Sequence, residues 1–471
     1  MTLAPRLSHA WPFLLATLAS VVLFYPSWAR LGKIWLDWDN TIADGLPAVV
    51  AFLFVLAIHP PVETCGSKSR SIFLDWVAGG LLLVVLAIVW SSLELVRLDT
   101  LAFFTLPASL FAISWCLIGF SSSLAFTPYI AILSLSIPFW ADLIPLLVKI
   151  ATLVVSHTIH AIGITALIEG SNITLPYGRL VIADGCSGVG YLSTLLLLGS
   201  IAATLNDYRW RGWLLVLGGA TLLALIINWV RIFALVIIAD QTNMQSSLVR
   251  EHELFGWLVF GAFALPSLLL LPVQRRKTLQ LGDEKRLRLP AFGFIFLALI
   301  AGNGTLHFVQ THEIRSKPLS LSGSELREIK PTALPVKLQI SDQLGQRAFI
   351  EDRTNVYVSL AQHQRQSETD KIVPYLPSLV DRNLWFREAI PAPGMEVWRR
   401  ISIPKRVIVS HIYAIGPYRT NSYAKAKLLQ LPAVYSGKTG FTLISLQAAC
   451  ETSTCEDAVE RLTAFKAKND I

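Results

Sequence analysis

Nine apolar runs, most of them close to 20 residues long, fill the first 304 residues of the chain and restrict what it can fold into. They cover residues 10–28, 44–60, 72–91, 98–119, 124–140, 190–206, 212–239, 254–272 and 289–304. Because a helix needs roughly 20 apolar residues to cross a bilayer, the runs predict an all-α polytopic membrane bundle of about eight or nine transmembrane helices. The run at 289–304 is short and interrupted by glycine, and it is the weakest of the set.

The composition agrees with a membrane protein. Of the 471 residues, 53% are hydrophobic and only 15% are charged, whereas a soluble globular chain carries about 25% charged residues. The first run could also be a signal peptide, because Arg6 precedes it and Ser27-Trp28-Ala29 loosely resembles a cleavage site. Bulky Pro26 and Trp28 fit cleavage poorly, and we therefore favour an uncleaved first span.

Lys and Arg residues in the short loops indicate the orientation, because they accumulate on the cytoplasmic side of membrane proteins. Residues 273–288 contain six of them, so this loop is predicted to be cytoplasmic. Alternation of the runs then puts residues 206–211, with two arginines, on the same side. It puts Cys186, Arg231 and His252 together at the opposite, extracytoplasmic face.

Residues 141–168 leave two topologies open. They hold Lys149, His157 and His160 among apolar residues, a more amphipathic mixture than that of the runs. If this segment lies in the interface or re-enters, the N-terminus and the loop 61–71, with Lys68 and Arg70, are cytoplasmic. If it crosses, both are placed outside against the charge rule. We favour the first topology, and the face assigned to Cys186 is the same in both.

Beyond residue 304 the chain becomes polar and rich in proline, which predicts an extracytoplasmic α+β domain over residues 305–471. Alternating apolar residues predict strands at 336–340, 356–360 and 406–410, and helices are predicted at 424–431 and 456–466. The expected organisation is a membrane domain over 1–272, a basic cytoplasmic loop with the last transmembrane helix over 273–304, and the outer domain. The net charge of +8 is not arranged as a stripe, so no nucleic-acid partner is expected.

The five cysteines divide by compartment. Cys65 lies in a loop predicted to be cytoplasmic, and Cys116 lies inside a run, where a buried thiol is the ordinary expectation. Cys450 and Cys455 are close together in the outer domain, where either a disulfide or two free thiols is possible. Cys186 stands alone, as a nucleophile would. No CxxC motif and no Cys/His cluster with zinc spacing occurs in the sequence, which argues against dithiol exchange and metal hydrolysis and predicts no metal or cofactor.

Cys186 is the first candidate for a catalytic residue. Gly185, Ser187 and Gly188 flank it and leave the backbone open to a substrate. It also precedes a predicted helix, whose N-terminal dipole favours negative charge. The alternative is an inert thiol packed among small residues where the helix begins.

Arg231 and His252 are the two partners that the sequence offers. An arginine inside a span is costly and usually faces a polar interior, although a long side chain can also reach the headgroups. Asn228 lies on the same helical face and Asp240 lies at the outer end of the span. His252, between Glu251 and Glu253, is either an acid–base group or an ordinary interfacial histidine, and His157 and His160 are secondary acid–base candidates.

Three ordered motifs in the sequence resemble those of the exosortase/archaeosortase family. They are Ala-Asp-Gly-Cys186-Ser187-Gly188-Val-Gly-Tyr191, then Asn228-Trp-Val-Arg231-Ile, then His252-Glu-Leu-Phe-Gly256-Trp, and the resemblance covers roughly residues 10–272. It implies a sortase-like membrane cysteine peptidase or transpeptidase with Cys186, Arg231 and His252 as catalytic residues. Gly190, where a bulkier residue would be expected, leaves the substrate subclass open.

The resemblance also implies partners and a location. Members act through a thioester on exported proteins with a C-terminal sorting signal, which consists of a Pro-Glu-Pro-type motif, a membrane helix and a basic tail. The region after 304 is similar in placement to an exosortase-associated C-terminal domain found in polysaccharide loci, on the weaker stretch Asn355-Val-Tyr-Val-Ser-Leu-Ala-Gln362. The expected location is the cell inner membrane, with the lipid bilayer as a further partner and the last domain in the periplasm. The sequence does not indicate the oligomeric state.

Two other functions are compatible with a polytopic chain. A transporter or channel would use Arg231 and Asp240 as charges along its pathway, but the inverted repeats that would favour it are not visible in the sequence. A non-catalytic scaffold of polysaccharide export would leave Cys186 inert. A trapped thioester would separate the enzyme from both.

Overall fold

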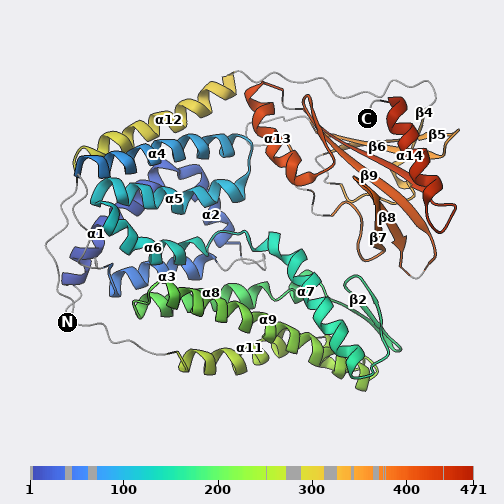
Figure 1. The fold of residues 1–471 in the computed structure, drawn as a ribbon, viewed down its shortest axis with the longest axis horizontal. Coiled ribbons are helices and arrows are strands. Elements are labelled where there is room, and N and C mark those ends of the chain that lie inside the picture. The colour runs from blue at the N-terminus through green and yellow to red at the C-terminus, as the bar shows by residue number, and fades with distance from the viewer. Residues whose placement is uncertain are drawn as a thin grey trace. The chain divides into compact units, whose positions relative to one another are not determined.

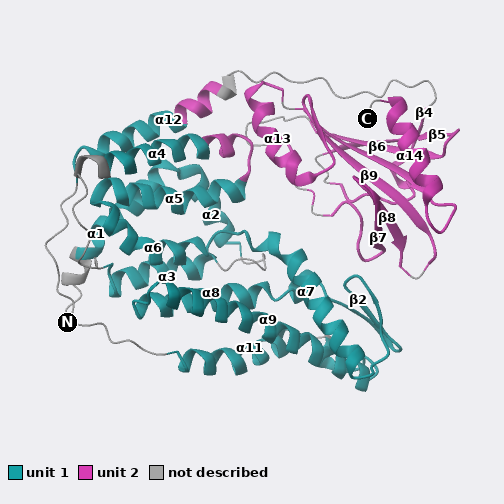
Figure 2. Ribbon diagram, viewed as in Figure 1, with its two compact units in different colours: residues 1–90, 99–302 teal, residues 91–98, 303–471 magenta. Residues whose placement is uncertain are grey.

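The computed structural model describes residues 4–37, 45–61, 72–250, 252–271, 288–311, 326–340, 344–363, 371–374, 376, 378–401, 403–438 and 440–469. The chain forms two compact units, shown in Figure 2. Unit 1 comprises residues 1–90 and 99–302 and is helical, and unit 2 comprises residues 91–98 and 303–471 and contains a large β-sheet. This arrangement confirms the predicted fold class.

Unit 1 is built mainly from apolar helices, most of them long (Figure 1). Their bounds are α1 Ala4–Leu23, α2 Tyr25–Trp35, α3 Gly45–Ile58, α4 Ile72–Leu95, α5 Asp99–Ile118, α6 Phe120–Ser134, α7 Trp140–Ala161, α8 Val189–Leu205, α9 Trp210–Gln241, α10 Ser247–Arg250, α11 His252–Leu269 and α12 Ala291–Thr311, of which α4 and α12 continue into unit 2. Among the described residues, seven helices are long and apolar enough to cross a membrane, or eight if α1 and α2 are counted as one broken span.

Two of the predicted runs were wrong in detail. The run 10–28 is not one helix, because the chain bends by 99° between α1 and α2. Pro26 lies in the first turn of α2, where its missing N–H and fixed φ allow a helix to start but not to continue from the preceding one. The run 124–140 is also interrupted. Helix α6 ends at Ser134, and residues 135–139, which include Pro138, form turns before α7 begins.

Helix α7 is long and apolar enough to cross a membrane, and it packs along the later part of α9. Its first residue, Trp140, packs with Tyr191 and Ala224. Its later residue Ile159 packs with Val236 and Ala239, which lie much further along α9. Figure 1 shows α7 running obliquely to α6 and α8. The packing places α7 beside the later part of α9, and the topology of residues 141–168 stays a prediction.

The ends of α3, α5 and α8 lie together at one end of the bundle, whereas Arg30 and Arg97 lie at the opposite end, beside the start of α5. The Nε2 of His59, after α3, lies 3.1 Å from the Oδ1 of Asp207, after α8. The backbone N–H of Arg288 donates to the carbonyl of Leu117 at the end of α5. We call this the basic end, and it also holds Arg209 and Arg211. Residues 62–71, with Cys65, Lys68 and Arg70, and residues 272–287 lie outside the described part of the chain.

Helix α12 runs from the basic end to the opposite end. It lies parallel to α4, because Phe294 stacks edge-on against Trp76 near the start of both helices, while Gly302 lies beside Trp90 near their ends. The end of α12 is therefore on the side where α7 begins and α8 starts. This alternation is the one predicted from the basic loops, and the compartment on each side stays a prediction.

A small antiparallel sheet between α7 and α8 was not predicted. Its strands are β1 Leu167–Glu169, β2 Asn172–Leu175 and β3 Gly178–Val181, in the order β1-β2-β3. Gly170, with φ of +63°, makes the turn between β1 and β2. Buried Ile173, Leu175 and Ile182 attach the sheet to α7 and to the last turns of α9.

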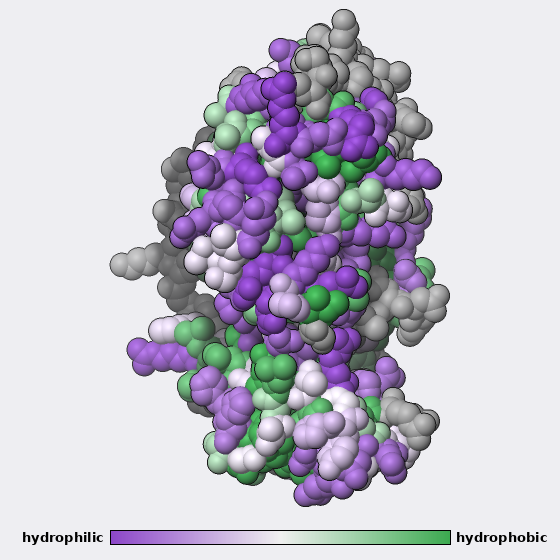
Figure 3. All heavy atoms as spheres, turned by 90° about the vertical axis from the view of Figure 1, so that its right-hand side faces the viewer, coloured by the Kyte–Doolittle hydropathy of each residue, from purple (hydrophilic) through white to green (hydrophobic). Residues whose placement is uncertain are grey.

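Unit 2 contains an antiparallel sheet of eight strands in the order β4-β5-β6-β11-β9-β8-β7, with β10 paired to β9. The strands are β4 Leu326–Ile329, β5 Gly345–Glu351, β6 Val356–His363, β7 Trp385–Ala392, β8 Met395–Arg400, β9 Arg406–Ile415, β10 Tyr418–Thr420 and β11 Phe441–Ala449. Helix α14 (Glu456–Asn469) buries Leu462 and Phe465 against one face of this sheet. In Figure 3 the upper part of the surface, which belongs to this unit, is mainly hydrophilic.

The strands predicted at 356–360 and 406–410 lie within β6 and β9, and the two predicted helices lie within α13 (Tyr423–Tyr435) and α14. The strand predicted at 336–340 was wrong. Only Leu338 makes a bridge there, to Val380. The buried amide of Gln447 binds both the N–H and the carbonyl of Val336, so these groups are not free for a ladder.

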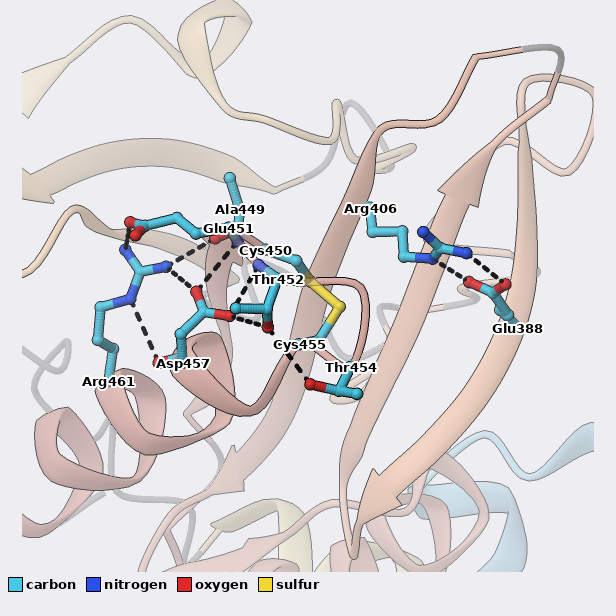
Figure 4. Close-up of a disulfide and its surroundings, with 10 residues drawn as sticks. All are labelled: Glu388, Arg406, Ala449, Cys450, Glu451, Thr452, Thr454, Cys455, Asp457 and Arg461. Carbon is cyan, nitrogen blue, oxygen red and sulfur yellow. Dashed lines mark hydrogen bonds and ion pairs between the residues drawn. A yellow bond between two sulfur atoms is a disulfide. The ribbon is translucent and has the colours of Figure 1, made fainter.

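Cys450 and Cys455 form a disulfide, which decides between the two possibilities that the sequence left open. Figure 4 shows that the bridge closes a short loop in front of α14.

Burial alone would raise the pKa of Asp457, but hydrogen bonds from Thr452, from the backbone N–H of Glu451 and from Arg461 outweigh it and lower this pKa to about 2.

Candidate active site

Cys186 ends a single 3-10 turn, η1 (Asp184–Cys186), directly in front of α8. Its N–H donates to the carbonyl of Ala183 at 2.8 Å. Gly188 has φ of +82°, a conformation that side chains disfavour, and it redirects the chain into the helix. The thiol is half-buried. A Cβ added at Gly185 or Gly190 would meet nothing within 4 Å, so open space lies on both sides of the turn.

His252 is the first residue of α11 and contacts Cys186. Its Nε2 lies 3.8 Å from the Sγ of Cys186, although 66 residues separate the two in sequence. The imidazole is therefore in position to exchange a proton with the thiol, since catalytic hydrogen bonds are often long before substrate binds. Glu253 is exposed, and Glu251 lies outside the described residues.

Arg231, on α9, contacts the backbone of His252. It is only 5% exposed. Its Nη2 donates to the carbonyl of His252 at 3.4 Å, and its guanidinium lies 5.8 Å from the centre of the Tyr191 ring. Its Nε is buried and has no hydrogen-bond partner in the described part of the chain. A buried cation of this kind needs a negative or strongly polar partner, and a charge that develops beside Cys186 could supply one.

Asn228 completes the cluster one turn before Arg231. Its Nδ2 donates to the carbonyl of Cys186 at 3.0 Å, and the side chain is 1% exposed. It also packs against Gly188, where an added Cβ would clash with it. The sequence placed Asn228 on the face of Arg231 but did not indicate this contact. The only signal was an amide at helical spacing from an arginine in an apolar run.

The structure thus links Cys186, His252 and Arg231, and it leaves the other candidates apart. Asp240 lies nine residues beyond Arg231, roughly 14 Å along the helix axis. His157 and His160 are exposed on α7, and His157 contacts the carbonyl of Leu153 in its own helix. No three potential metal ligands come together among the described residues.

Residues 35–269 match the model of the transmembrane exosortase family. The chain belongs to this family. The match covers Cys186, Asn228, Arg231 and His252 and ends with α11. No curated protein and no solved structure matches this chain. Residues 305–471 lie beyond the matched residues, so their similarity to the exosortase-associated domain stays a prediction.

The length of α9 gives the distance of the site from the basic end of the bundle. From Trp210 at the basic end to Asn228 the helix rises roughly 27 Å, which is close to the roughly 30 Å thickness of the hydrocarbon core. The remaining 13 residues extend roughly 20 Å further and carry the packing of α7 and β1–β3. Cys186 therefore lies about one membrane thickness from the basic end.

Proposed function

We propose that this exosortase is a cysteine peptidase or transpeptidase that cleaves the C-terminal sorting signal of exported proteins through a thioester. The contact between Cys186 Sγ and His252 Nε2, at 3.8 Å, carries the proposal. Two further observations support it. The thiol is accessible beside open glycines, and a buried guanidinium lies directly behind the histidine.

In the first half-reaction, His252 Nε2 takes the proton of the Cys186 thiol as the sulfur attacks the scissile carbonyl. The carbonyl oxygen becomes an oxyanion, and the positive charge of Arg231 stabilises it, a contribution that is often the largest in acyl transfer. The intermediate then collapses, the C–N bond breaks, and His252 gives its proton to the leaving amine. A thioester remains on Cys186.

In the second half-reaction, His252 takes a proton from the incoming nucleophile. An amine then gives transpeptidation and water gives hydrolysis, and in both cases the thioester carbonyl–sulfur bond breaks and the thiol recovers a proton. Asn228 takes no proton in this scheme. By binding the carbonyl of Cys186, it fixes the backbone of the nucleophile relative to α9.

The position of the site supports the proposed substrate class. An exported protein held by a C-terminal helix with a basic tail would place that tail at the basic end and the residues before its helix near Cys186. We therefore place the basic end in the cytoplasm and unit 2 in the periplasm, with the protein in the cell inner membrane. The disulfide of unit 2 supports an oxidising compartment. The link to envelope or exopolysaccharide export rests on the family resemblance alone.

The proposal is tested with a co-expressed exported protein that carries a Pro-Glu-Pro-type motif, a membrane helix and a basic tail. Cys186→Ala is expected to abolish its processing while the enzyme stays in the membrane. Cys116→Ala is the matched control, because Cys116 is buried in α5 away from the site and should be dispensable. Hydroxylamine should release a substrate adduct from the wild type and from Cys116→Ala only. Wild-type processing by Cys186→Ala would refute the proposal and favour a transporter or scaffold.

A further inference from the structure

The small sheet has a free edge on the strand that directly precedes the proposed nucleophile in the chain. In the order β1-β2-β3, strand β3 pairs only with β2, so its other edge has no strand partner among the described residues. A strand edge of this kind presents unpaired N–H and carbonyl groups that can bind another extended chain.

The direction of these groups follows from one hydrogen bond. The N–H of Ile182 donates to the carbonyl of Ser171 and therefore points toward β2. Along an antiparallel strand, successive residues alternate between pointing toward the partner and away from it. Arg179 and Val181 therefore direct their backbone groups to the free edge. The carbonyl of Val181 accepts the N–H of Ala183, which leaves the N–H and carbonyl of Arg179 and the N–H of Val181 without a backbone partner in the described part of the chain.

The same strand leads directly to Cys186. The turn from Val181 to Ala183 lies on the free-edge side, because the carbonyl of Val181 points away from β2. Five residues separate Val181 from Cys186, so their Cα atoms are at most roughly 17 Å apart. Two tight turns, closed by Ala183 N–H and Cys186 N–H, shorten this distance further. A chain paired with β3 would thus reach the thiol within about five extended residues.

The two faces of β3 are also distinct. Leu180 and Ile182 pack on α7 and α9. The side chains of Arg179 and Val181 are exposed on the other face. An added strand would therefore extend a sheet whose inner face already packs on α7 and α9. The exposed side chains of Arg179 and Val181 would then lie beside the outward-facing side chains of the added strand.

We propose that the extended stretch of the substrate next to its scissile bond binds to the free edge of β3 as a fourth strand. This inference rests on the proposed peptidase function and adds how the substrate is held. Pairing of this kind recognises backbone groups, so it tolerates varied sequences and presents the substrate in the extended form that attack by a thiol requires.

The first test removes one edge donor. Val181→Pro lacks the outward N–H, and a proline is tolerated where a strand N–H faces away from the sheet. Ile168→Pro is the matched control, because the N–H of Ile168 points away from β2 at the far edge of the sheet. With the same tripartite-signal protein as probe, we expect processing by Val181→Pro to fall roughly fivefold to tenfold, the loss of one hydrogen bond, and processing by Ile168→Pro to stay within about twofold of wild type. Equal processing by both variants would overturn the inference.

A second test is independent of how Val181→Pro folds. In the inactive Cys186→Ser protein, Val181→Cys is paired with single cysteines placed along the residues that precede the substrate helix. Strand pairing predicts disulfides at alternate substrate positions, because successive side chains point to opposite faces. Leu167→Cys, on the far edge at β1, is the control and should give none.

Disulfides at consecutive positions, or equally from Leu167→Cys, would overturn the proposed pairing. If Cys186→Ala still processes the substrate, the peptidase function itself fails. If processing depends on Cys186 but neither strand test gives the expected pattern, only the β3 inference fails.

Discussion

Replacing Gly256 with alanine should disturb the site without removing any of its polar groups. Gly256 lies one helical turn after His252, and a Cβ there would be 2.7 Å from Arg231 Nε and closer still to the Tyr191 hydroxyl. Because non-bonded heavy atoms settle at about 3.5 Å or more, the guanidinium or α11 must move by roughly 0.8 Å. A misplacement of about 1 Å in a catalytic site can cost about 100-fold in rate. We therefore expect processing to fall between about tenfold and 100-fold.

The assay measures processing of the tripartite-signal protein, normalised to the amount of enzyme in the membrane. Gly261→Ala is the matched control, because it lies on the same helix and its added Cβ would meet nothing within 4 Å. Both variants raise helix propensity equally, so a difference between them reports the contact with Arg231. Equal rates for the two variants would refute the idea that the position of Arg231 controls turnover.

Four further predictions follow from individual contacts. Arg231→Lys should lower processing by at least about 100-fold with normal expression, because an ammonium cannot reproduce the planar fork of donors; near-normal turnover would make Arg231 a membrane anchor only. Asn228→Asp, which keeps the shape but cannot donate to the Cys186 carbonyl, should lower kcat more than it changes KM, and a change confined to KM would contradict this. Burial lowers the pKa of His411 in unit 2 to about 4, against the opposing effect of Glu396. The free energy of unfolding of unit 2 should therefore fall as the pH falls from 6.5 toward 4, by about 1.4 kcal/mol per pH unit at most. Hydrogen exchange measures this loss, and His411→Gln should remove it. A reporter active only outside the cytoplasm should be active after Ile471 and silent after Arg276, and the reverse would place the site in the cytoplasm.

The helices of unit 1 could be predicted from the sequence because their cause is local. An apolar run of sufficient length must satisfy its backbone internally in lipid, and a helix does so within one segment. The breaks were harder to locate. Pro26 starts a new helix at 99° to the first, although proline inside α5 at Pro107 does not end that helix. Whether a proline ends a helix depends on neighbouring packing as well as on the residue itself.

The candidate site was predictable as a set of residues and not as a geometry. Cys186, Arg231 and His252 are unusual residues in apolar surroundings, and alternation of the runs placed them on one face. Their contacts depend on how α8, α9 and α11 pack together. The role of Asn228 toward the Cys186 carbonyl and the close approach of Gly256 to Arg231 are of this kind. The sheet β1–β3 was missed because its strands have only three or four residues, too few for a clear alternation.

The length of α9 explains why the site and the free edge of β3 occur together. A peptide bond within a lipid-embedded helix is held by its own hydrogen bonds and cannot be attacked unless the helix unwinds, which lipid penalises because freed backbone groups find no partner. A peptidase acting on a membrane-anchored protein therefore gains by placing its thiol where the substrate helix ends. Asn228 and Arg231 lie roughly 27 Å and roughly 32 Å from Trp210 along α9, distances close to the roughly 30 Å thickness of the hydrocarbon core. The part of α9 beyond them supports α7 and the small sheet. In the proposed function, the substrate backbone leaves its helix at that depth and needs new partners, which the edge of β3, a few residues from Cys186, would supply.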